Sequence, residues 1–257
     1  MPQLGTLLRF WRQERGKSQL DLSLDTGISQ RHLSFVESGR SAPSRNLLST
    51  VSDALNIPLR ERNALLLASG YAPKYSEPSI DDEQMEVVTL AVDRMLYQHE
   101  PHPALVLDRH WNVVRTNQAA PTFFGSFIDL TTRSKPRNLL ELMFDPEGMR
   151  PFIEDWRTVA SGLLQRVKRE AVGHMLDPGL QDLLKKLHRY PGAVDLEIES
   201  TLQSPVLPIT FLRNGQRLSY FSLVTTVGTP QCITAQELRV ECMFPGDVVP
   251  TKRKSSH

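Results

Sequence analysis

The chain has 257 residues, of which 40% are hydrophobic and 23% charged, a composition typical of folded globular proteins and unlike that of disordered or fibrous chains. Its longest apolar runs, such as 64–68, span only a few residues, whereas a membrane-spanning helix needs about 20. Arg9, Arg12 and Glu14 lie where a secretory signal has its apolar core. We therefore expect a cytoplasmic protein of one or two domains with no membrane partner.

The net charge of +1 conceals an uneven distribution along the chain. Residues 1–75 hold ten basic and six acidic side chains (net +4), whereas the remainder holds 20 basic and 23 acidic ones (net −3). Such asymmetry indicates that the two parts of the chain have different roles.

The first seventy residues predict five short helices. Apolar side chains from Leu4 to Trp11 recur at helical spacing, and this helix should end near Gly16. Gly27 suits a tight turn between the second and third helices, and Gly39 closes the third. The next four helices are expected to start at Ser18, Ser29, Pro43-Ser44 and Pro58.

We place a linker at 71–80, where prolines interrupt the helical pattern, and a second domain at 81–250. Helical patterns are expected at 81–98, 117–124, 139–144, 152–170 and 180–187. Strands are expected at 104–107, 111–114, 194–198, 206–212, 218–227 and 238–243, with hairpin turns at 108–110 and Asn214-Gly215. This order predicts an antiparallel sheet with its helices on one face, hence an α+β protein. Residues 251–257 should form a disordered basic tail.

Residues 19–36 fit the spacing of a helix-turn-helix, in which a second helix enters the major groove of DNA. The constrained positions are Gln19, Leu22, Ser23, Gly27, Ile28, Leu33 and Val36. On these residues, 4–68 resemble the XRE family of phage-repressor-type helix-turn-helix domains, although that family usually has alanine at the position of Ser23. The alternative is an ordinary helical hairpin. The resemblance makes Arg12 and Glu37 a structural pair between the first and third helices.

The third helix should turn its polar face toward the bases. Gln30 can bind adenine and Arg31 guanine through paired hydrogen bonds, whereas Phe35 either packs on a neighbouring helix or touches a thymine methyl group. The resemblance assigns Gln19 a phosphate contact and a supporting role for Gln30, and the start of the fourth helix suits another phosphate. Solvated surface charge is the alternative for each arginine. The candidate DNA contacts are Gln19, Ser29, Gln30, Arg31, Ser34, Phe35, Arg40, Ser44 and Arg45.

Residues 82–247 resemble the MmyB-like ligand-binding domain, which has a PAS-like fold. The resemblance is carried by 102–109, 111–114, Asn117 and 221–230, while 188–192 replace a segment in which that family often has tryptophan. It implies an apolar effector, such as a fatty acid, between sheet and helices. The candidate cavity residues are Met143, Phe144, Phe152, Trp156, Phe211, Tyr220 and Phe221. For each of these residues, a place in the hydrophobic core is the alternative. Asn117 is expected to cap a helix, and a ligand contact is its alternative.

No metal, cofactor or catalytic site is predicted. The only two cysteines, Cys232 and Cys242, form neither a disulfide framework nor a zinc spacing, and no cation cluster activates them. His99, His102 and His110 lack acidic or cysteine partners at ligand spacing and should be surface histidines. Nucleophile-elbow, phosphate-loop and zinc-protease motifs are missing.

We therefore expect a homodimeric transcription regulator that binds double-stranded operator DNA. An effector in the second domain would control it through the linker 71–78. The alternatives are a DNA-binding protein whose second domain only dimerises and, from another class, an enzyme tethered to DNA.

Overall fold

The computed structural model describes residues 3–172, 177–193, 196 and 206–246. It divides into two units, the first formed by 1–79 with 229–236 and the second by 80–228 with 237–257. The expected strand at 194–198 and the expected tail at 251–257 lie outside the described residues, apart from Leu196.

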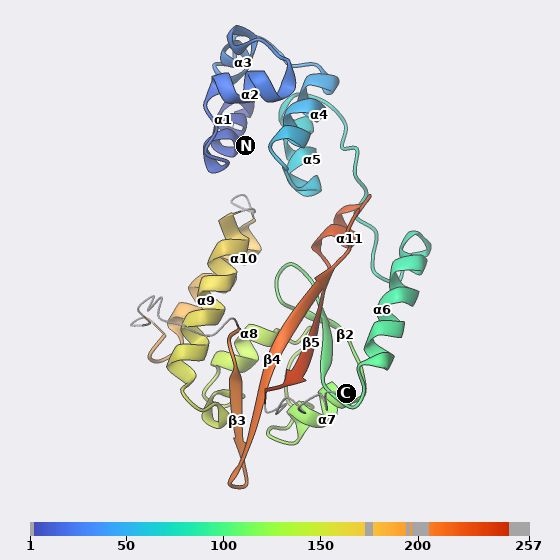
Figure 1. Cartoon of the computed structure of the whole chain (residues 1–257), viewed down its shortest axis with the longest axis vertical. Coiled ribbons are helices and arrows are strands. Elements are labelled where there is room, and N and C mark those ends of the chain that lie inside the picture. The colour runs from blue at the N-terminus through green and yellow to red at the C-terminus, as the bar shows by residue number, and fades with distance from the viewer. Residues whose placement is uncertain (1–2, 173–176, 194–195, 197–205, 247–257) are drawn as a thin grey trace, which may run out of the picture. The chain divides into compact units, whose positions relative to one another are not determined.

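The first unit contains the five predicted helices (Figure 1). They are α1 (Leu4–Glu14), α2 (Gln19–Thr26), α3 (Gln30–Glu37), α4 (Arg45–Ala54) and α5 (Leu59–Ala68). Their starts follow local signals, because the side chains of Ser18, Ser29 and Ser44 each accept a backbone N–H in the first turn of the next helix. Gly27 ends α2 with φ of 69°, a left-handed conformation that favours glycine.

The core of this unit is formed by the apolar faces of its helices. Trp11 is 2% exposed, and Leu22 and Val36 are also buried against leucines of α4 and α5. Gly5 of α1 lies against the backbone of Glu37, where an added Cβ would stand 2.1 Å from the carbonyl oxygen. Close packing of α1 on α3 therefore requires glycine at this position.

The second unit is built on one antiparallel sheet, which confirms the predicted α+β class (Figure 1). The strands are β1 (Ala104–Leu107), β2 (Val113–Thr116), β3 (Ile209–Arg213), β4 (Gln216–Thr226) and β5 (Arg239–Pro245), in the order β2-β1-β5-β4-β3. The turn at Asn214-Gly215 joins β3 to β4, with both residues at positive φ. In the register, Ala104 pairs with Cys242 and Leu223 also pairs with Cys242 from the other side.

Helices cover both faces of this sheet, so the prediction of helices on one face was wrong. The bounds are α6 (Glu86–Gln98), α7 (Ala119–Gly125), α8 (Leu139–Phe144), α9 (Trp156–Val172) and α10 (Pro178–Arg189). Alternate residues of β1 separate two cores. Leu105 and Leu107 pack with α7 to α10, while Ala104 and Val106 pack against Val92 and other residues of α6. Figure 1 shows α6 on the opposite side of the sheet from α8, α9 and α10.

Several elements begin later than predicted, and for α6, β2 and α9 the reason is local. Before α6 the chain forms a 3-10 turn at Glu83–Met85, capped by the side chain of Asp82. The second strand excludes Trp111, whose φ is 67°. Asp155, with φ of 49°, precedes α9. Positive φ is incompatible with both regular strand and right-handed helix.

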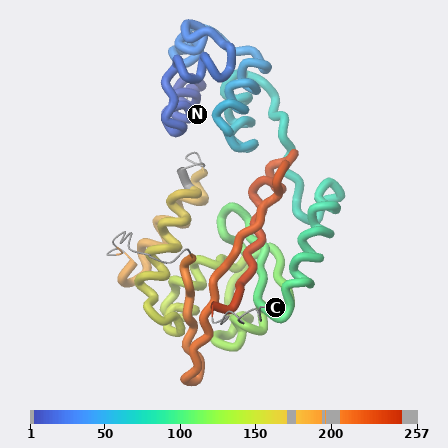
Figure 2. The backbone as a smooth tube through the Cα atoms, viewed as in Figure 1, coloured from blue at the N-terminus to red at the C-terminus, as the bar shows by residue number. Residues whose placement is uncertain are grey.

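A short segment of the second half of the chain belongs to the first unit. Residues 229–236 connect β4 to β5, and Figure 2 follows the chain through this connection, which includes α11 (Ile233–Glu237). The Ile233 N–H donates to the carbonyl of Ser76, and the Leu59 N–H donates to Oε1 of Gln236 at 2.6 Å. The side chain of Gln236 thus caps α5, whose N-cap residue Pro58 offers no side-chain acceptor.

Candidate functional site

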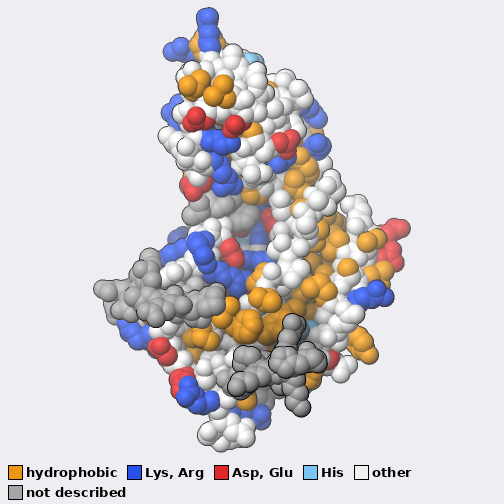
Figure 3. Space-filling view, in the orientation of Figure 1, with side chains coloured by type: hydrophobic (Ala, Val, Ile, Leu, Met, Phe, Trp, Pro, Cys, Tyr) orange, Lys and Arg blue, Asp and Glu red, His pale blue; other side chains and the backbone are white. Residues whose placement is uncertain are grey.

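The exposed face of α3 carries the side chains predicted to contact bases. Leu33 and Val36 point into the core, while Gln30 and Arg31 are exposed and Ser34 and Phe35 are half-buried. The Oγ of Ser29 accepts the His32 N–H at 3.3 Å, so this serine is used as a cap. Figure 3 shows Lys and Arg side chains at the α2–α3 end of the first unit.

Two arginines flank the aromatic ring on this face. The guanidinium carbon of Arg31 lies 5.3 Å from the ring centroid of Phe35, and that of Arg40 lies 6.0 Å from it. Among the described residues, no acidic side chain pairs with either arginine. Phe35 therefore organises two cations that remain available to an anionic partner.

The start of α4 forms a second basic position. The Oγ of Ser44 accepts the Leu47 N–H at 3.2 Å, and the guanidinium carbon of Arg45 lies 4.8 Å from the ring centroid of Tyr71. Both Ser44 and Arg45 are exposed. A helix N-terminus with an adjacent arginine provides backbone donors and positive charge, the combination that binds a phosphate group.

A buried carboxylate connects α1, α2 and α3. Glu37 accepts hydrogen bonds from Nε and Nη2 of Arg12 at 2.7 and 3.0 Å, as the resemblance implied, and from Nε2 of Gln19 at 2.9 Å. Burial by itself would raise the pKa of Glu37, but the hydrogen bonds from Arg12 and Gln19 and the charges of Arg12 and Arg9 outweigh it and hold that pKa below its usual value. The amide nitrogen of Gln19 is thus bound to Glu37, while its contact with phosphate and its support for Gln30 stay predictions.

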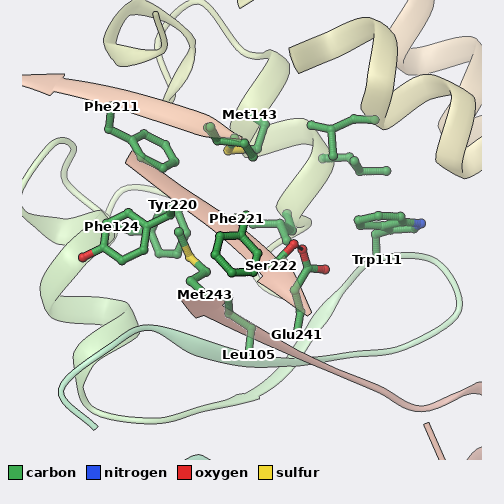
Figure 4. A pocket seen from close by; sticks show the side chains of 14 residues that line it. Leu105, Trp111, Phe124, Met143, Phe211, Tyr220, Phe221, Ser222, Glu241 and Met243 are labelled. Carbon is green, nitrogen blue, oxygen red and sulfur yellow. Dashed lines mark hydrogen bonds between the residues drawn. The ribbon is translucent and has the colours of Figure 1, made fainter. Parts of the chain in front are cut away.

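The second unit contains a cavity between its sheet and helices (Figure 4). Its volume is about 40 Å³, which is room for a few water molecules. The side chains that line it are Leu105, Trp111, Phe124, Leu139, Leu140, Met143, Leu163, Ile209, Phe211, Tyr220, Phe221, Ser222, Glu241 and Met243. Most of them are apolar, which is typical of sites for small molecules.

The seven candidate cavity residues fall into three groups. The cavity is lined by Met143, Phe211, Tyr220 and Phe221. Phe144 and Trp156 do not line it and instead pack in the adjoining core, where the Trp156 indole N–H donates to the carbonyl of Met143. Phe152 lines a separate, more open hollow beside Phe127. Phe144 and Trp156 are thus structural residues.

Sequence reasoning missed the polar side chains of the cavity, Ser222 and Glu241. The Oγ of Ser222 donates to Oε1 of Glu241 at 2.7 Å, and Figure 4 shows the two side chains close together. Glu241 is only 7% exposed. A glutamate within an otherwise apolar strand pattern, Val240 to Met243, was the available signal, because such residues are rarely buried without a reason.

His99, His102 and His110 are half-buried, which corrects their prediction as surface residues. His110 Nε2 lies 2.9 Å from Oδ2 of Asp177, and His99 Nε2 lies 2.8 Å from the Met243 carbonyl oxygen. Burial would raise the pKa of Asp177, but the hydrogen bond from His110 and the charge of Arg109 hold it below its usual value. No group of three metal-ligating side chains occurs among the described residues.

Two smaller predictions can be compared with the structure. Burial, and secondarily the charge of Glu241, raise the pKa of Cys242, which disfavours its reactive thiolate. Asn117 Oδ1 accepts the N–H groups of Ala104 and Ala120, so its side chain anchors β1 and the first turn of α7. It is absent from the cavity lining.

Comparisons with known proteins identify both parts of the chain. A model described as "MmyB-like transcription regulator ligand binding domain" matches residues 88–253, more than half of the chain, and a "Helix-turn-helix" model matches 8–62. The chain belongs to the MmyB-like transcription regulators. Neither matched family is an enzyme family, and no helix in the described part of this regulator is long and apolar enough to cross a membrane.

Other comparisons add little to this assignment. No curated protein matches the regulator. A solved structure described as an RNA-binding light-oxygen-voltage receptor is similar at 11% identity with a TM-score of 0.28. The match covers 94% of the regulator but only 59% of that chain.

Proposed function

We propose that this regulator binds a specific operator in double-stranded DNA, with α3 in the major groove. The observation that carries the proposal is the exposed face of α3, where Gln30 and Arg31 project without acidic partners among the described residues. Arg40, Arg45 and the start of α4 supply the adjacent phosphate contacts. The local charge supports this assignment, because residues 1–75 carry a net +4.

The cavity of the second unit is the proposed site of a small apolar effector. Sites for small molecules usually enclose about 300–1,000 Å³, so the observed cavity of about 40 Å³ would have to widen on binding. The small volume also favours a second candidate, in which this domain only dimerises.

A second copy of the chain is the proposed partner of α6. Val87, Leu90 and Tyr97 are 81%, 62% and 81% exposed on the face of this helix opposite its buried side, and apolar side chains are visible at the surface near α6 in Figure 3. In an antiparallel pair of α6 helices with Leu90 on the twofold axis, Arg94 would face the partner's Glu86. This face is therefore self-complementary in charge as well as apolar.

The connection at 229–236 offers a route from the effector to DNA binding. Its flanking strands contribute Phe221, Ser222, Glu241 and Met243 to the cavity, while the connection itself caps α5 through Gln236. A ligand that separates β4 from β5 would therefore act on the first unit in addition to any effect through the linker 71–78.

Two measurements test the proposed function. Genome-wide footprinting should find a defined set of sites, and an operator from that set should bind purified protein far more tightly than unrelated DNA. Native mass spectrometry of protein from several expression hosts should show a lipid-sized adduct that alters operator affinity. Defined sites without any adduct would favour the dimerisation-only candidate, and absence of sites would refute DNA regulation.

A further inference from the structure

The cavity has a distinct polar end formed by neighbouring strands. Ser222 of β4 and Glu241 of β5 project to the same side, and the serine hydroxyl donates to the carboxylate at 2.7 Å. Among the described residues that line this cavity, Glu241 is the only one with a charged side chain. A ligand that fills the cavity therefore meets a carboxylate and no lining cation.

Arg166 and Arg239, the cations next to this end, are each paired with glutamate, although Nε of Arg239 is buried without a hydrogen-bond partner in the described part of the chain. Arg166 of α9 approaches Glu241 with Nη1 at 3.3 and 3.4 Å from the two carboxylate oxygens, but its Nε also binds Glu170 at 3.2 Å. Glu170 in turn pairs with Arg239. Two arginines and two glutamates balance each other in this cluster.

Packing keeps both arginines in place. Their guanidinium carbons lie 4.4 Å (Arg166) and 5.0 Å (Arg239) from the ring centroid of Trp111, which is fully buried. Arg239 also donates to the carbonyl of Asp108 at 2.8 Å. Turning either arginine toward a ligand would break several interactions at once.

The charge at the polar end determines which head groups fit. A ligand carboxylate would add an unbalanced negative charge, next to Glu241, to a cluster in which two arginines and two glutamates already balance. A head group that donates a hydrogen bond would instead gain a charge-assisted bond to the carboxylate. Ser222 and Arg166 already donate hydrogen bonds to Glu241, so a ligand donor would use the lone pairs of the carboxylate that these two leave open.

We propose that the cavity selects apolar ligands whose head group donates a hydrogen bond, as an alcohol, amide or amine does, over ligands that end in an ionised carboxylate. Glu241 is the specificity-determining residue. This inference rests on the proposed effector function and departs from the fatty acid that the family resemblance implies.

The test is displacement of a neutral fluorescent probe, Nile red, from the full-length protein by dodecanol, dodecylamine and dodecanoate at neutral pH. The alcohol and the amine should displace the probe at concentrations at least about tenfold lower than the carboxylate, the factor that one charge-assisted hydrogen bond supplies. In Glu241→Gln, which keeps the shape of the side chain, the disadvantage of the carboxylate should largely disappear. Glu154→Gln is the matched control, because Glu154 pairs with Arg217 outside the cavity, and it should keep the wild-type order.

The outcomes separate this inference from the proposed function. If dodecanoate binds wild-type protein as well as dodecanol does, the head-group inference is overturned while the effector cavity stands. If none of the three compounds displaces the probe, the effector function fails and the inference fails with it. The wild-type order is decisive even if Glu241→Gln does not fold.

Discussion

At the residue scale, Arg31 is proposed to contact a base and Arg45 a phosphate group. Arg31 lies on the exposed face of α3 beside Phe35, whereas Arg45 lies at the start of α4 against Tyr71. Both are exposed, and under the proposed docking of α3 in the major groove only Arg31 would distinguish bases.

Substituting these two arginines should therefore have different effects. Arg31→Ala should weaken operator binding by about 1–3 kcal/mol and leave nonspecific binding nearly unchanged. Arg45→Ala should weaken binding to both DNAs and lower the salt slope by about one unit. Anisotropy titrations of operator and scrambled DNA at several salt concentrations measure both effects. Equal losses on the two DNAs for Arg31→Ala would refute its contact with bases.

Glu37 should contribute stability that depends on pH. Glu37→Gln removes the charge that accepts hydrogen bonds from Arg12 and Gln19, so the free energy of unfolding at neutral pH should fall by about 1.5–3 kcal/mol. Because the pKa of Glu37 is below its usual 4.5 in the folded state, the unfolded state takes up protons first as pH falls. The difference between wild type and variant should therefore shrink as pH falls through the folded-state pKa of Glu37.

Urea unfolding followed by circular dichroism measures this difference, and hydrogen exchange in α1 and α3 assigns it to the first unit. Glu14→Gln is the control, because Glu14 is exposed at the end of α1. A difference that stays constant with pH would contradict the role of the carboxylate charge.

At the scale of elements, α6 is unusual because it is apolar on two opposite sides. One side packs Val92 and Leu96 against the sheet, while the other exposes Leu90 and Tyr97. The helix is also tied to the edge strand, since Arg115 of β2 binds Asp93 at 3.0 Å. The exposed face of α6 therefore belongs to a helix that is held against the sheet by packing and by an ion pair.

The dimer proposed for this face can be tested by charge exchange. Leu90→Glu should raise the dimer Kd by roughly tenfold or more. It removes a leucine that the proposed dimer would bury, and it brings two carboxylates together at the twofold axis. Arg94→Glu and Glu86→Arg should each weaken the dimer a few-fold, and the double variant should restore it. Sedimentation equilibrium gives the constants, with Leu223→Glu as control because Leu223 is 52% exposed on β4. Failure of the double variant to recover would rule out the antiparallel pairing.

At the scale of the whole molecule, the chain does not divide at a single point. Residues 229–236 lie between β4 and β5 in the sequence but belong to the first unit. The chain therefore passes between the units twice more, before residue 229 and after residue 236, in addition to the linker. The charge asymmetry that the sequence shows between its two parts fits this division of roles.

Gln236→Ala should uncouple the effector from the operator. The substitution removes the acceptor for the Leu59 N–H at the start of α5 but touches neither α3 nor the cavity lining. Operator affinity without effector should stay within about twofold, whereas the effector-induced change, typically about 5–150-fold, should shrink at least threefold. Gln231→Ala is the control, since the Gln231 amide donates to Thr229 within its own segment. An unchanged effector response would exclude this route.

Much of the fold could be predicted because it depends on local signals. Serine caps and the glycine turn located the helices of the first unit, and alternation with a turn pair located β3 and β4. The side of the sheet covered by α6 could not be predicted, because its two apolar faces gave no basis for choosing. For the cavity, the sequence predicted the aromatic residues Phe211, Tyr220, Phe144 and Trp156 alike. Only the packing shows that the first two line the cavity and that the last two lie in the adjoining core.

The family, the helix-turn-helix and the exposed face of α3 could therefore be predicted from sequence, since these rest on residues a few positions apart that act through caps, turns and helical period. Three features became visible only in the folded chain: Gln236 caps α5, α6 leaves an apolar face exposed, and Glu241 lines the cavity. Gln236 and Leu59 are 177 residues apart, and the surroundings of Glu241 come from β4 and α9 as well as its own strand. Contacts of that kind depend on how distant segments pack, and no local pattern specifies them.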